Sequence, residues 1–290
     1  MTKRDEIFLP KLSPLMVRQA VEAALVEDLG LAGDVTSDAT LPPDAMAKAV
    51  LNTREDGILA GLDIARAAFE DLDARIVFKS LSTDAAPIKS GDNVAKIEGP
   101  ARAVLAAERV ALNYLCHLSG IATYTAEFAS EISHTKAKVC CTRKTIPGLR
   151  AFEKYAVKCG GGSNHRYGLD DAILIKDNHI AVAGGVKQAI EAARRFAGHL
   201  VKIEVEVDTL EQLEIALQAK PDVVMLDNMT LDELAQGVKM VDGRIPVEAS
   251  GNVSLATIRG IAETGVDMIS TSKITMSAPT LDLGLDITIR

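Results

Sequence analysis

The stretch that decides the fold is VKIEVEV, residues 201–207, a short run dominated by valine and isoleucine. Five further apolar runs share this character: AKVCCT at 137–142, AILIKD at 172–177, DVVMLDN at 222–228, IPVEAS at 245–250 and VDMIST at 266–271. Continuous apolar runs separated by amphipathic segments are typical of a parallel sheet covered by helices. The six units occupy only about 140 residues, whereas a complete eight-unit barrel takes roughly 250. We therefore predict an open or incomplete α/β barrel with about six parallel strands.

The chain before residue 100 has a different rhythm. Ser13-Pro14 is a typical helix start, with a capping residue followed by proline at the first helical position. A helical stretch at 62–72 lies among short strand-like pieces, which are 48–52, 75–79 and 93–97. This mixture is typical of a small α+β unit.

An apolar stripe predicts a helix from 101 to about 132 that leads from the first unit to the second, with a break near Ser119-Gly120. We expect an N-terminal domain at 1–116, a barrel domain at 117–275, and a C-terminal tail at 276–290 that packs back on the N-terminal domain.

The bulk composition limits the function classes. Hydrophobic residues make up 48% of the 290 residues and charged residues 25%, which is ordinary for globular proteins. The net charge of −8 gives no support to a nucleic-acid or anionic-membrane partner. No apolar run approaches the roughly 18 residues of a membrane span, and the N-terminus lacks a signal-peptide core, so we expect a cytoplasmic protein. The four cysteines form no CxxC pair and are expected to be buried free thiols.

Polar residues close most of the six apolar runs. In a barrel the strand ends converge on the carboxyl edge, where catalytic groups of this architecture lie. A charged residue at the end of one strand could simply be exposed to solvent, whereas charged residues at the ends of five consecutive strands favour a functional site. The members are Thr142-Arg143-Lys144, Lys176-Asp177-Asn178, Glu204 with Glu206, Asp227-Asn228, Glu248 with Ser250, and Ser270–Ser272.

Two carboxylates lie in one strand, since alternation places Glu204 and Glu206 on the same face, and Asp227 follows one unit later. Buried unpaired carboxylates are costly, so a metal ion or cationic side chains should lie near. Without neighbouring Cys or His ligands they favour a hard cation such as Mg²⁺, which binds through one or two carboxylates and substrate phosphates. The alternative is a structural salt-bridge network with Lys202, Lys176 or Arg143. For Glu204 alone the two interpretations are equally supported.

The last two runs pass into small residues, as VEASGN at 247–252 and ISTSK at 269–273. Backbone N–H groups and Ser hydroxyls at such junctions form anion cradles, and barrels often bind phosphate with their last two strand loops. Four cations, Arg143, Lys144, Arg166 and Lys176, should face the same opening and imply a ligand with several negative groups. Glycines 160–162 lack a phosphate-loop pattern and are expected to form a turn. Of the histidines, His165 and His179 are candidates because of their neighbours.

These motifs resemble those of the quinolinate phosphoribosyltransferase family. The resemblance is carried by ERVALNYL at 108–115, TRKTIPGLR at 142–150, the Lys158–His179 segment with its NHR and ILIKDNH elements, and VEASGN. It runs from about residue 27 to residue 287, nearly the whole chain. The family fold is an N-terminal α/β sandwich domain followed by an open α/β barrel.

The resemblance implies transfer of phosphoribose from phosphoribosyl pyrophosphate to quinolinate, with release of pyrophosphate and CO₂, to give nicotinate mononucleotide for NAD synthesis. It also implies a homodimer, with a higher oligomer left open. Arg143, His165, Arg166 and Lys176 match residues that hold the quinolinate carboxylates, and Arg109 matches an arginine supplied by the neighbouring chain.

The remaining matches concern the other substrate. Lys144 matches a residue close to the pyrophosphate, and Glu206 and Asp227 match the acids that position Mg²⁺ and the ribose. The 5′-phosphate cradle matches Ser250, Gly251, Asn252, Ser270, Thr271 and Ser272. Ser272 stands where many members have glycine, so a positive φ at this position would be strained.

Two alternatives remain open from the sequence. A paralogue of the same fold could act on another acceptor, such as nicotinate, although a mono-acid needs fewer cations than this chain supplies. A non-catalytic binding protein on a decayed barrel would lack some of these acids and cations, and all of them are present. We trust no Ser-His-Asp or Cys-His signature in the chain, which fits a reaction without a covalent nucleophile.

Overall fold

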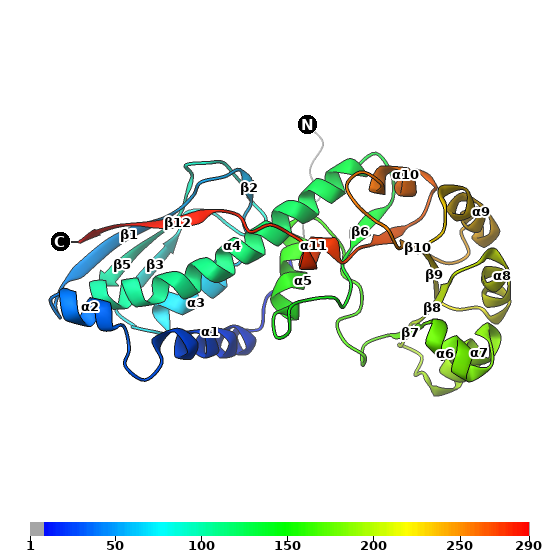
Figure 1. Ribbon diagram of the computed structural model, residues 1–290, viewed down its shortest axis with the longest axis horizontal. Helices are drawn as coiled ribbons and strands as arrows, with labels where there is room; N and C mark the ends of the chain where they lie inside the picture. Colours follow the sequence, from blue (N-terminus) through cyan, green and yellow to red (C-terminus); the bar gives the residue numbers. More distant parts are fainter. Residues whose placement is uncertain (1–8, 290) are drawn as a thin grey trace. The chain divides into compact units, whose positions relative to one another are not determined.

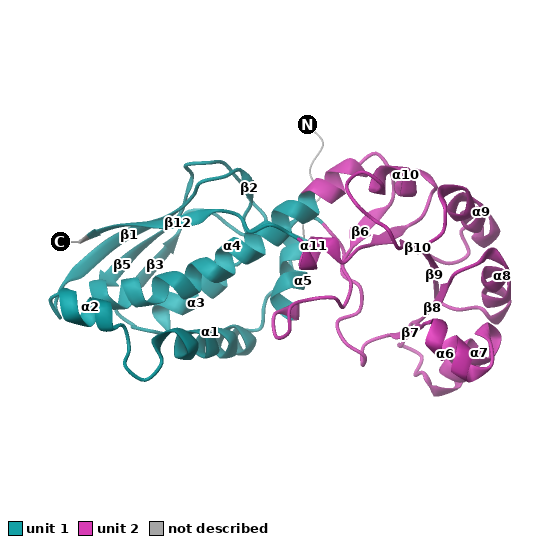
Figure 2. Cartoon of the chain, viewed as in Figure 1, with its two compact units in different colours: residues 1–126, 151–161, 278–290 teal, residues 127–150, 162–277 magenta. Residues whose placement is uncertain are grey.

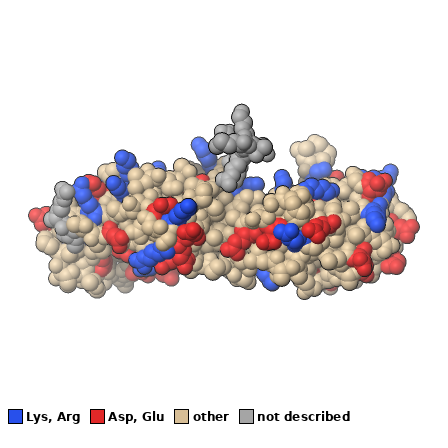
Figure 3. All heavy atoms as spheres, turned by 90° about the horizontal axis from the view of Figure 1, so that it is seen from above, with Lys and Arg blue, Asp and Glu red and all other residues tan. Residues whose placement is uncertain are grey.

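The computed structural model describes residues 9–289, so the prediction about a signal peptide falls partly on residues outside that range. The chain forms two compact units (Figure 2). Unit 1 comprises residues 1–126, 151–161 and 278–290, and unit 2 comprises residues 127–150 and 162–277. Within the described range no helix is both long and apolar enough to cross a bilayer. Acidic and basic side chains are interspersed on the face drawn in Figure 3.

Unit 1 is built on an antiparallel sheet with the order β12-β1-β5-β3 (Figure 1). Its strands are β1 (Met46–Thr53), β3 (Val77–Ser80), β5 (Asn93–Pro100) and β12 (Leu283–Ile289), and a small separate pair is formed by β2 (Gly57–Ile58) and β4 (Pro87–Ile88). The helices of the unit are α1 (Pro14–Leu29), α2 (Val35–Thr40), α3 (Leu62–Glu70), most of α4 (Ala101–Glu131) and most of α5 (Arg150–Cys159). Helix α3 contacts both α1 and β3.

The C-terminal strand β12 completes this sheet by pairing with β1, where Leu51 lies opposite Leu285. Alternate residues of β1 are buried, as expected for a strand with one face on the core. Residues from 278 onward thus belong to unit 1 although they follow the barrel in sequence.

Helix α4 is continuous from Ala101 to Glu131, so the predicted break near Ser119-Gly120 is wrong. Gly120 serves close packing instead of ending the helix. A Cβ atom at this position would lie 2.0 Å from the carbonyl oxygen of Pro279, and the hydroxyl of Ser119 is buried and bonded to the backbone of Ala60. The boundary between the units falls at Ala126 inside α4, ten residues beyond the expected domain boundary at 116.

Unit 2 contains the six predicted strands in one parallel sheet with the order β6-β11-β10-β9-β8-β7. They are β6 (Lys138–Cys140), β7 (Ile173–Ile175), β8 (Ile203–Val207), β9 (Val223–Asp227), β10 (Val247–Ser250) and β11 (Met268–Ser270). Strands β6 and β7 are the two edges, so the barrel is open, and the predicted fold class is confirmed.

Helices lie outside the curved sheet of unit 2 (Figure 1). They are α6 (Asp177–Ala183), α7 (Val186–Phe196), α8 (Leu210–Ala219), α9 (Leu231–Val241) and α10 (Ile258–Glu263), and a short α11 (Lys273–Met276) follows β11. The strands are mostly buried because helices cover one face and side chains fill the other, which explains the continuous apolar runs. The four cysteines are free thiols, and all but the partly exposed Cys116 are buried.

Candidate active site

The carboxyl ends of β9, β10 and β11 surround a cavity of about 510 Å³. Its lining includes the six residues predicted for phosphate binding together with Lys144 and Asp227. Asn228, which follows Asp227 in the predicted strand-end set, also lines it, as do Ser254 and Lys273, which were not predicted as site residues. Lys273 is the second lysine of the cavity, after Lys144. Its position directly after Ser272 is a sequence signal that could have identified it.

Backbone conformation shapes this cavity between β9 and β10. Gly251 has φ of +92°, and a Cβ atom there would lie 2.2 Å from Oδ1 of Asn228. Asn228 and Asn252 both have φ of +54°, which asparagine tolerates better than most residues. Ser272 has φ of −80° and ψ of −12°, so serine fits without strain at this position.

Glu206 and Asp227 lie near the ends of neighbouring strands. The carboxylate of Glu206 is nearly buried and pairs with Nζ of Lys176. Oδ2 of Asp227 accepts a hydrogen bond of 2.6 Å from the side chain of Asn228. Asp227 lines the carboxyl-end cavity, whereas Glu206 does not. Mg²⁺ binds through one or two carboxylates together with substrate phosphates, so the carboxylate of Asp227 fits that ion at this cavity.

Arg143 and Arg166 were predicted as cations of the site, and they lie close enough for their charges to repel each other. Both have a buried Nε atom without a hydrogen-bond partner among the described residues. Burial, followed by repulsion from Arg143, lowers the pKa of Arg166. Its Nη1 atom donates to the carbonyl oxygen of Ala172 at 3.0 Å. Two neighbouring guanidinium groups with unused donors are well suited to bind a multiply charged anion.

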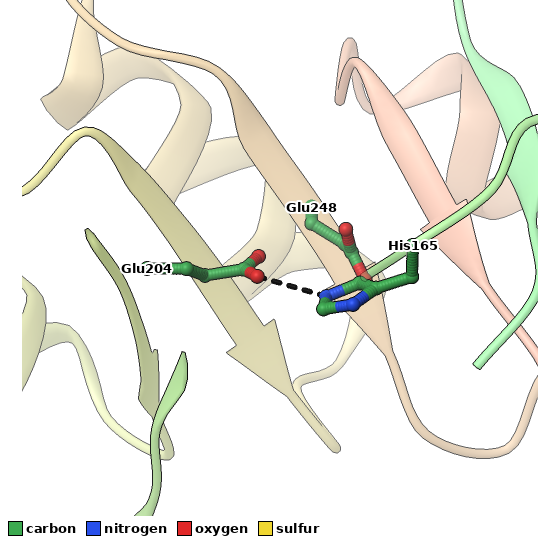
Figure 4. Close-up of side chains that lie close together, drawn as sticks. All are labelled: His165, Glu204 and Glu248. Carbon is green, nitrogen blue, oxygen red and sulfur yellow. Dashed lines mark hydrogen bonds and ion pairs between the residues drawn. The ribbon is translucent and has the colours of Figure 1, made fainter. Parts of the chain in front are cut away.

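His165, Glu204 and Glu248 meet inside the barrel (Figure 4). Nε2 of His165 lies 2.8 Å from Oε2 of Glu204 and 3.9 Å from Oε1 of Glu248. They line a second cavity, of about 710 Å³, whose rim includes residues that begin or precede the strands, namely Lys136, Lys202, Val223, Pro246 and Asp267. This cavity therefore opens toward the amino ends of the sheet.

The position of the two glutamates corrects one prediction. Glu204 and Glu248 are the second residues of β8 and β10, so they do not stand at carboxyl ends as the strand pattern suggested. The runs are longer than the strands they contain, and sequence alone does not mark which end is structured. His165 and Arg166 line the amino-end cavity, whereas Lys144 lines the carboxyl-end one, so the predicted set does not converge on a single opening.

Burial and the charge of Glu204 raise the pKa of the Glu248 carboxyl from its ordinary value of 4.5 to about 7, although His165 and a hydrogen bond with Ser270 act in the opposite direction. Between about pH 4.5 and pH 7 the Glu248 carboxyl therefore keeps its proton in the folded chain and loses it in the unfolded chain. Stability should therefore fall as pH rises from about 4.5 to 7, by up to about 3 kcal/mol, and level off above that.

Replacing Glu248 by glutamine should remove this pH dependence. We expect the melting temperature of Glu248→Gln, relative to that of the wild type, to increase between pH 5.5 and pH 8. The reason is that only the wild type must bury a charge as the pH rises. Thermal unfolding of both proteins across this range checks the prediction. A melting-temperature difference that stays constant with pH would contradict it.

Two further predicted residues, His179 and Arg109, are exposed. His179 is exposed, and its Nδ1 atom accepts from the backbone N–H of Lys176 at 3.0 Å, which caps helix α6. Arg109 is exposed on α4 in unit 1.

An open parallel barrel with a hydroxyl-lined cavity, lysines and carboxylates at its carboxyl edge defines an α/β-barrel enzyme that handles phosphorylated substrates. Known proteins narrow this class. The pattern of the quinolinate phosphoribosyl transferase C-terminal domain matches residues 121–286, and that of the N-terminal domain matches residues 34–119. The chain belongs to the quinolinate phosphoribosyltransferase family.

Individual relatives match along nearly their whole length. The probable nicotinate-nucleotide pyrophosphorylase (carboxylating) of Bacillus subtilis is 40% identical, covering 96% of each chain. The nicotinate-nucleotide pyrophosphorylase (carboxylating) of Mycobacterium leprae is 41% identical over 93% of this chain and 96% of its own. Among solved structures, NadC from Streptococcus pyogenes superimposes with a TM-score of 0.93 at 41% identity, covering 97% of this chain and 99% of that one.

Proposed function

We propose that the protein transfers phosphoribose from phosphoribosyl pyrophosphate to the ring nitrogen of quinolinate, with loss of CO₂, to give nicotinate mononucleotide and pyrophosphate. The observation that carries this proposal is the juxtaposition, in one barrel, of two arginines with unused donors and a hydroxyl-lined cavity. Relatives named for this reaction match 93% or more of the chain at about 40% identity.

The dicarboxylate is bound by cations in this proposal. Arg143 and Arg166 offer unpartnered Nε donors, and Lys176 adds a third positive charge that Glu206 holds in place. Guanidinium groups bind carboxylates in bidentate fashion, so two of them can orient both acid groups of a pyridine dicarboxylate. A pyridine mono-acid would leave part of this positive charge unmatched, which favours quinolinate over nicotinate as the acceptor.

Phosphoribosyl pyrophosphate occupies the carboxyl-end cavity in this proposal. Its 5′-phosphate would accept hydrogen bonds from the turns at Ser250–Asn252 and Ser270–Ser272, and Lys144 would lie near the pyrophosphate. Glu206 and Asp227 are the residues that would hold Mg²⁺, which supplies positive charge to the leaving pyrophosphate.

The reaction needs positioning and electrostatics and no covalent nucleophile. As the C–O bond to pyrophosphate breaks, the ribose carbon becomes cation-like, and fixed carboxylates favour that charge while Lys144 stabilises the leaving group. The ring nitrogen then forms the new bond to the ribose. Loss of CO₂ from the adjacent ring carbon leaves a carbanion that the positive ring stabilises until it takes up a proton.

We further propose a homodimer in which Arg109 of one chain completes the site of the other. Arg109 is exposed on α4, so its guanidinium is accessible to a second copy of the chain. A dicarboxylate site that draws its cations from two chains would have no full affinity in a monomer. Cytoplasmic localisation is likewise part of the proposal.

The direct test is turnover of quinolinate with phosphoribosyl pyrophosphate and Mg²⁺, followed by release of pyrophosphate. We expect quinolinate to be used with a kcat/KM at least about 100-fold above that for nicotinate, because each unmatched charge-assisted contact costs about 1.5–3 kcal/mol. Equal use of both acceptors, or of neither, would contradict the proposed substrate. Metal-free enzyme in a chelator serves as the control.

A further inference from the structure

The ring of His165 is held from both sides. The backbone N–H of Arg166 donates to Nδ1 at 2.8 Å, and an N–H can only donate, so Nδ1 carries no proton in this arrangement. The ring proton is then on Nε2, which faces Oε2 of Glu204 at 2.8 Å (Figure 4). The three groups form a continuous chain from the carboxylate of Glu204 to the backbone of Arg166.

We propose that His165 and Glu204 are positioning residues, which fix the main chain from which Arg166 reaches the dicarboxylate, and that His165 does not itself donate to the substrate. This inference rests on the proposed function. Arg166 is held at two points, through its backbone by His165 and through Nη1 by the carbonyl of Ala172. Its Nε atom, which is buried and unpartnered among the described residues, is left for the ligand.

Glu204 is placed to hold the ring firmly. It is 8% exposed, and strand β8 pairs with both β7 and β9, so its backbone is fixed by neighbours on either side. The ring of His165 is also nearly buried, with 11% of its side chain exposed. A hydrogen bond to a carboxylate in such surroundings is stronger than one in water.

A metal ion at this cluster is the competing interpretation, because the ligand atoms of His165, Glu204 and Glu248 all lie within 4.8 Å of one another. A neutral histidine that binds a metal through Nε2 carries its proton on Nδ1. Two donors, Nδ1–H and the N–H of Arg166, would then face each other at 2.8 Å. The observed bond therefore favours the hydrogen-bonded chain.

The kinetic test compares two substitutions of Glu204. Glu204→Leu removes the acceptor, and we expect the KM for quinolinate to rise about tenfold or more, since a hydrogen bond to a charged group is lost and Arg166 loses its alignment. The KM for phosphoribosyl pyrophosphate should change less than about twofold. Glu204→Gln keeps an oxygen that can accept from Nε2, and it should restore the quinolinate KM to within about threefold of the wild type. Glu214→Gln, at an exposed position on α8, is the control for loss of a glutamate charge and should behave like the wild type.

A second readout does not depend on activity. The measurement is nitrogen-15 NMR of the wild-type protein labelled at histidine, in which the His165 signals are assigned by comparison with a His165→Asn variant. The spectrum should show a protonated Nε2 and an unprotonated Nδ1. Addition of Zn²⁺ or Mn²⁺ alone should leave these ring signals unchanged. A protonated Nδ1, or a metal-dependent change at Nε2, would overturn the inference. Two kinetic results would also overturn it: an unchanged quinolinate KM in Glu204→Leu, or a Glu204→Gln enzyme as impaired as Glu204→Leu. If the wild type turned over no quinolinate, the proposed function would fail while the NMR result still decided the geometry.

Discussion

Replacing Arg166 by alanine is expected to raise the KM for quinolinate about 100-fold. Its guanidinium keeps a buried Nε without a partner among the described residues and lies near Arg143, so under the proposed function the variant would remove a charge-assisted, bidentate contact to one carboxylate of the ligand. Such a contact contributes about 3 kcal/mol, and each 1.4 kcal/mol corresponds to about a tenfold change in affinity. Steady-state kinetics at saturating phosphoribosyl pyrophosphate measures the effect.

The same variant should change the KM for phosphoribosyl pyrophosphate less than about threefold, because Arg166 does not line the carboxyl-end cavity. Arg195→Ala provides a matched control, since Arg195 is an exposed arginine on the outer helix α7. Equal losses for both substrates in Arg166→Ala would contradict the role assigned to this residue.

Replacing Asp227 by asparagine is expected to lower kcat by a factor of about 10³. The substitution keeps the size of the side chain and removes the negative charge that would hold Mg²⁺ and favour the cation-like ribose carbon, and loss of one preorganised electrostatic group typically costs about 10²–10³ in kcat. Single-turnover kinetics over a range of Mg²⁺ concentrations measures the effect.

Two comparisons show whether this loss is specific. Calorimetric binding of quinolinate to Asp227→Asn should stay within about twofold of the wild type, because the proposed function assigns the dicarboxylate contacts to other residues. Asp232→Asn, at an exposed position in α9, is the control for removal of an aspartate charge. A kcat for Asp227→Asn within threefold of the wild type would remove this residue from the proposed machinery.

Much of the barrel could be predicted from the sequence because its signals are local. The six apolar runs contain the six parallel strands, and the open sheet follows from the length that the units occupy. The small residues at 250–252 and 270–272 surround one cavity, as predicted, because each group directly ends or follows its strand. The ion pair between Glu206 and Lys176 belongs to the salt-bridge network that the sequence left open as the alternative to a metal ion.

Other features depend on contacts between distant segments, which a local pattern does not reveal. Gly120 looks like a helix break, yet the chain near Pro279 packs against it and explains the missing side chain. Glu204 and Glu248 stand at the starts of their strands and turn toward His165, which comes from a loop. The bond from the backbone of Arg166 to His165 is set by the conformation of that loop.

The proposed reaction couples phosphoribose transfer to decarboxylation, and the stoichiometry of the products tests this coupling most directly. Quinolinate carrying labelled carbon in the carboxyl group next to the ring nitrogen should be incubated with phosphoribosyl pyrophosphate, Mg²⁺ and the wild-type protein, and labelled CO₂ and pyrophosphate counted together. We predict one CO₂ for each pyrophosphate and nicotinate mononucleotide as the nucleotide product. Pyrophosphate without CO₂, or neither product across a range of pH and Mg²⁺ concentrations, would contradict the account.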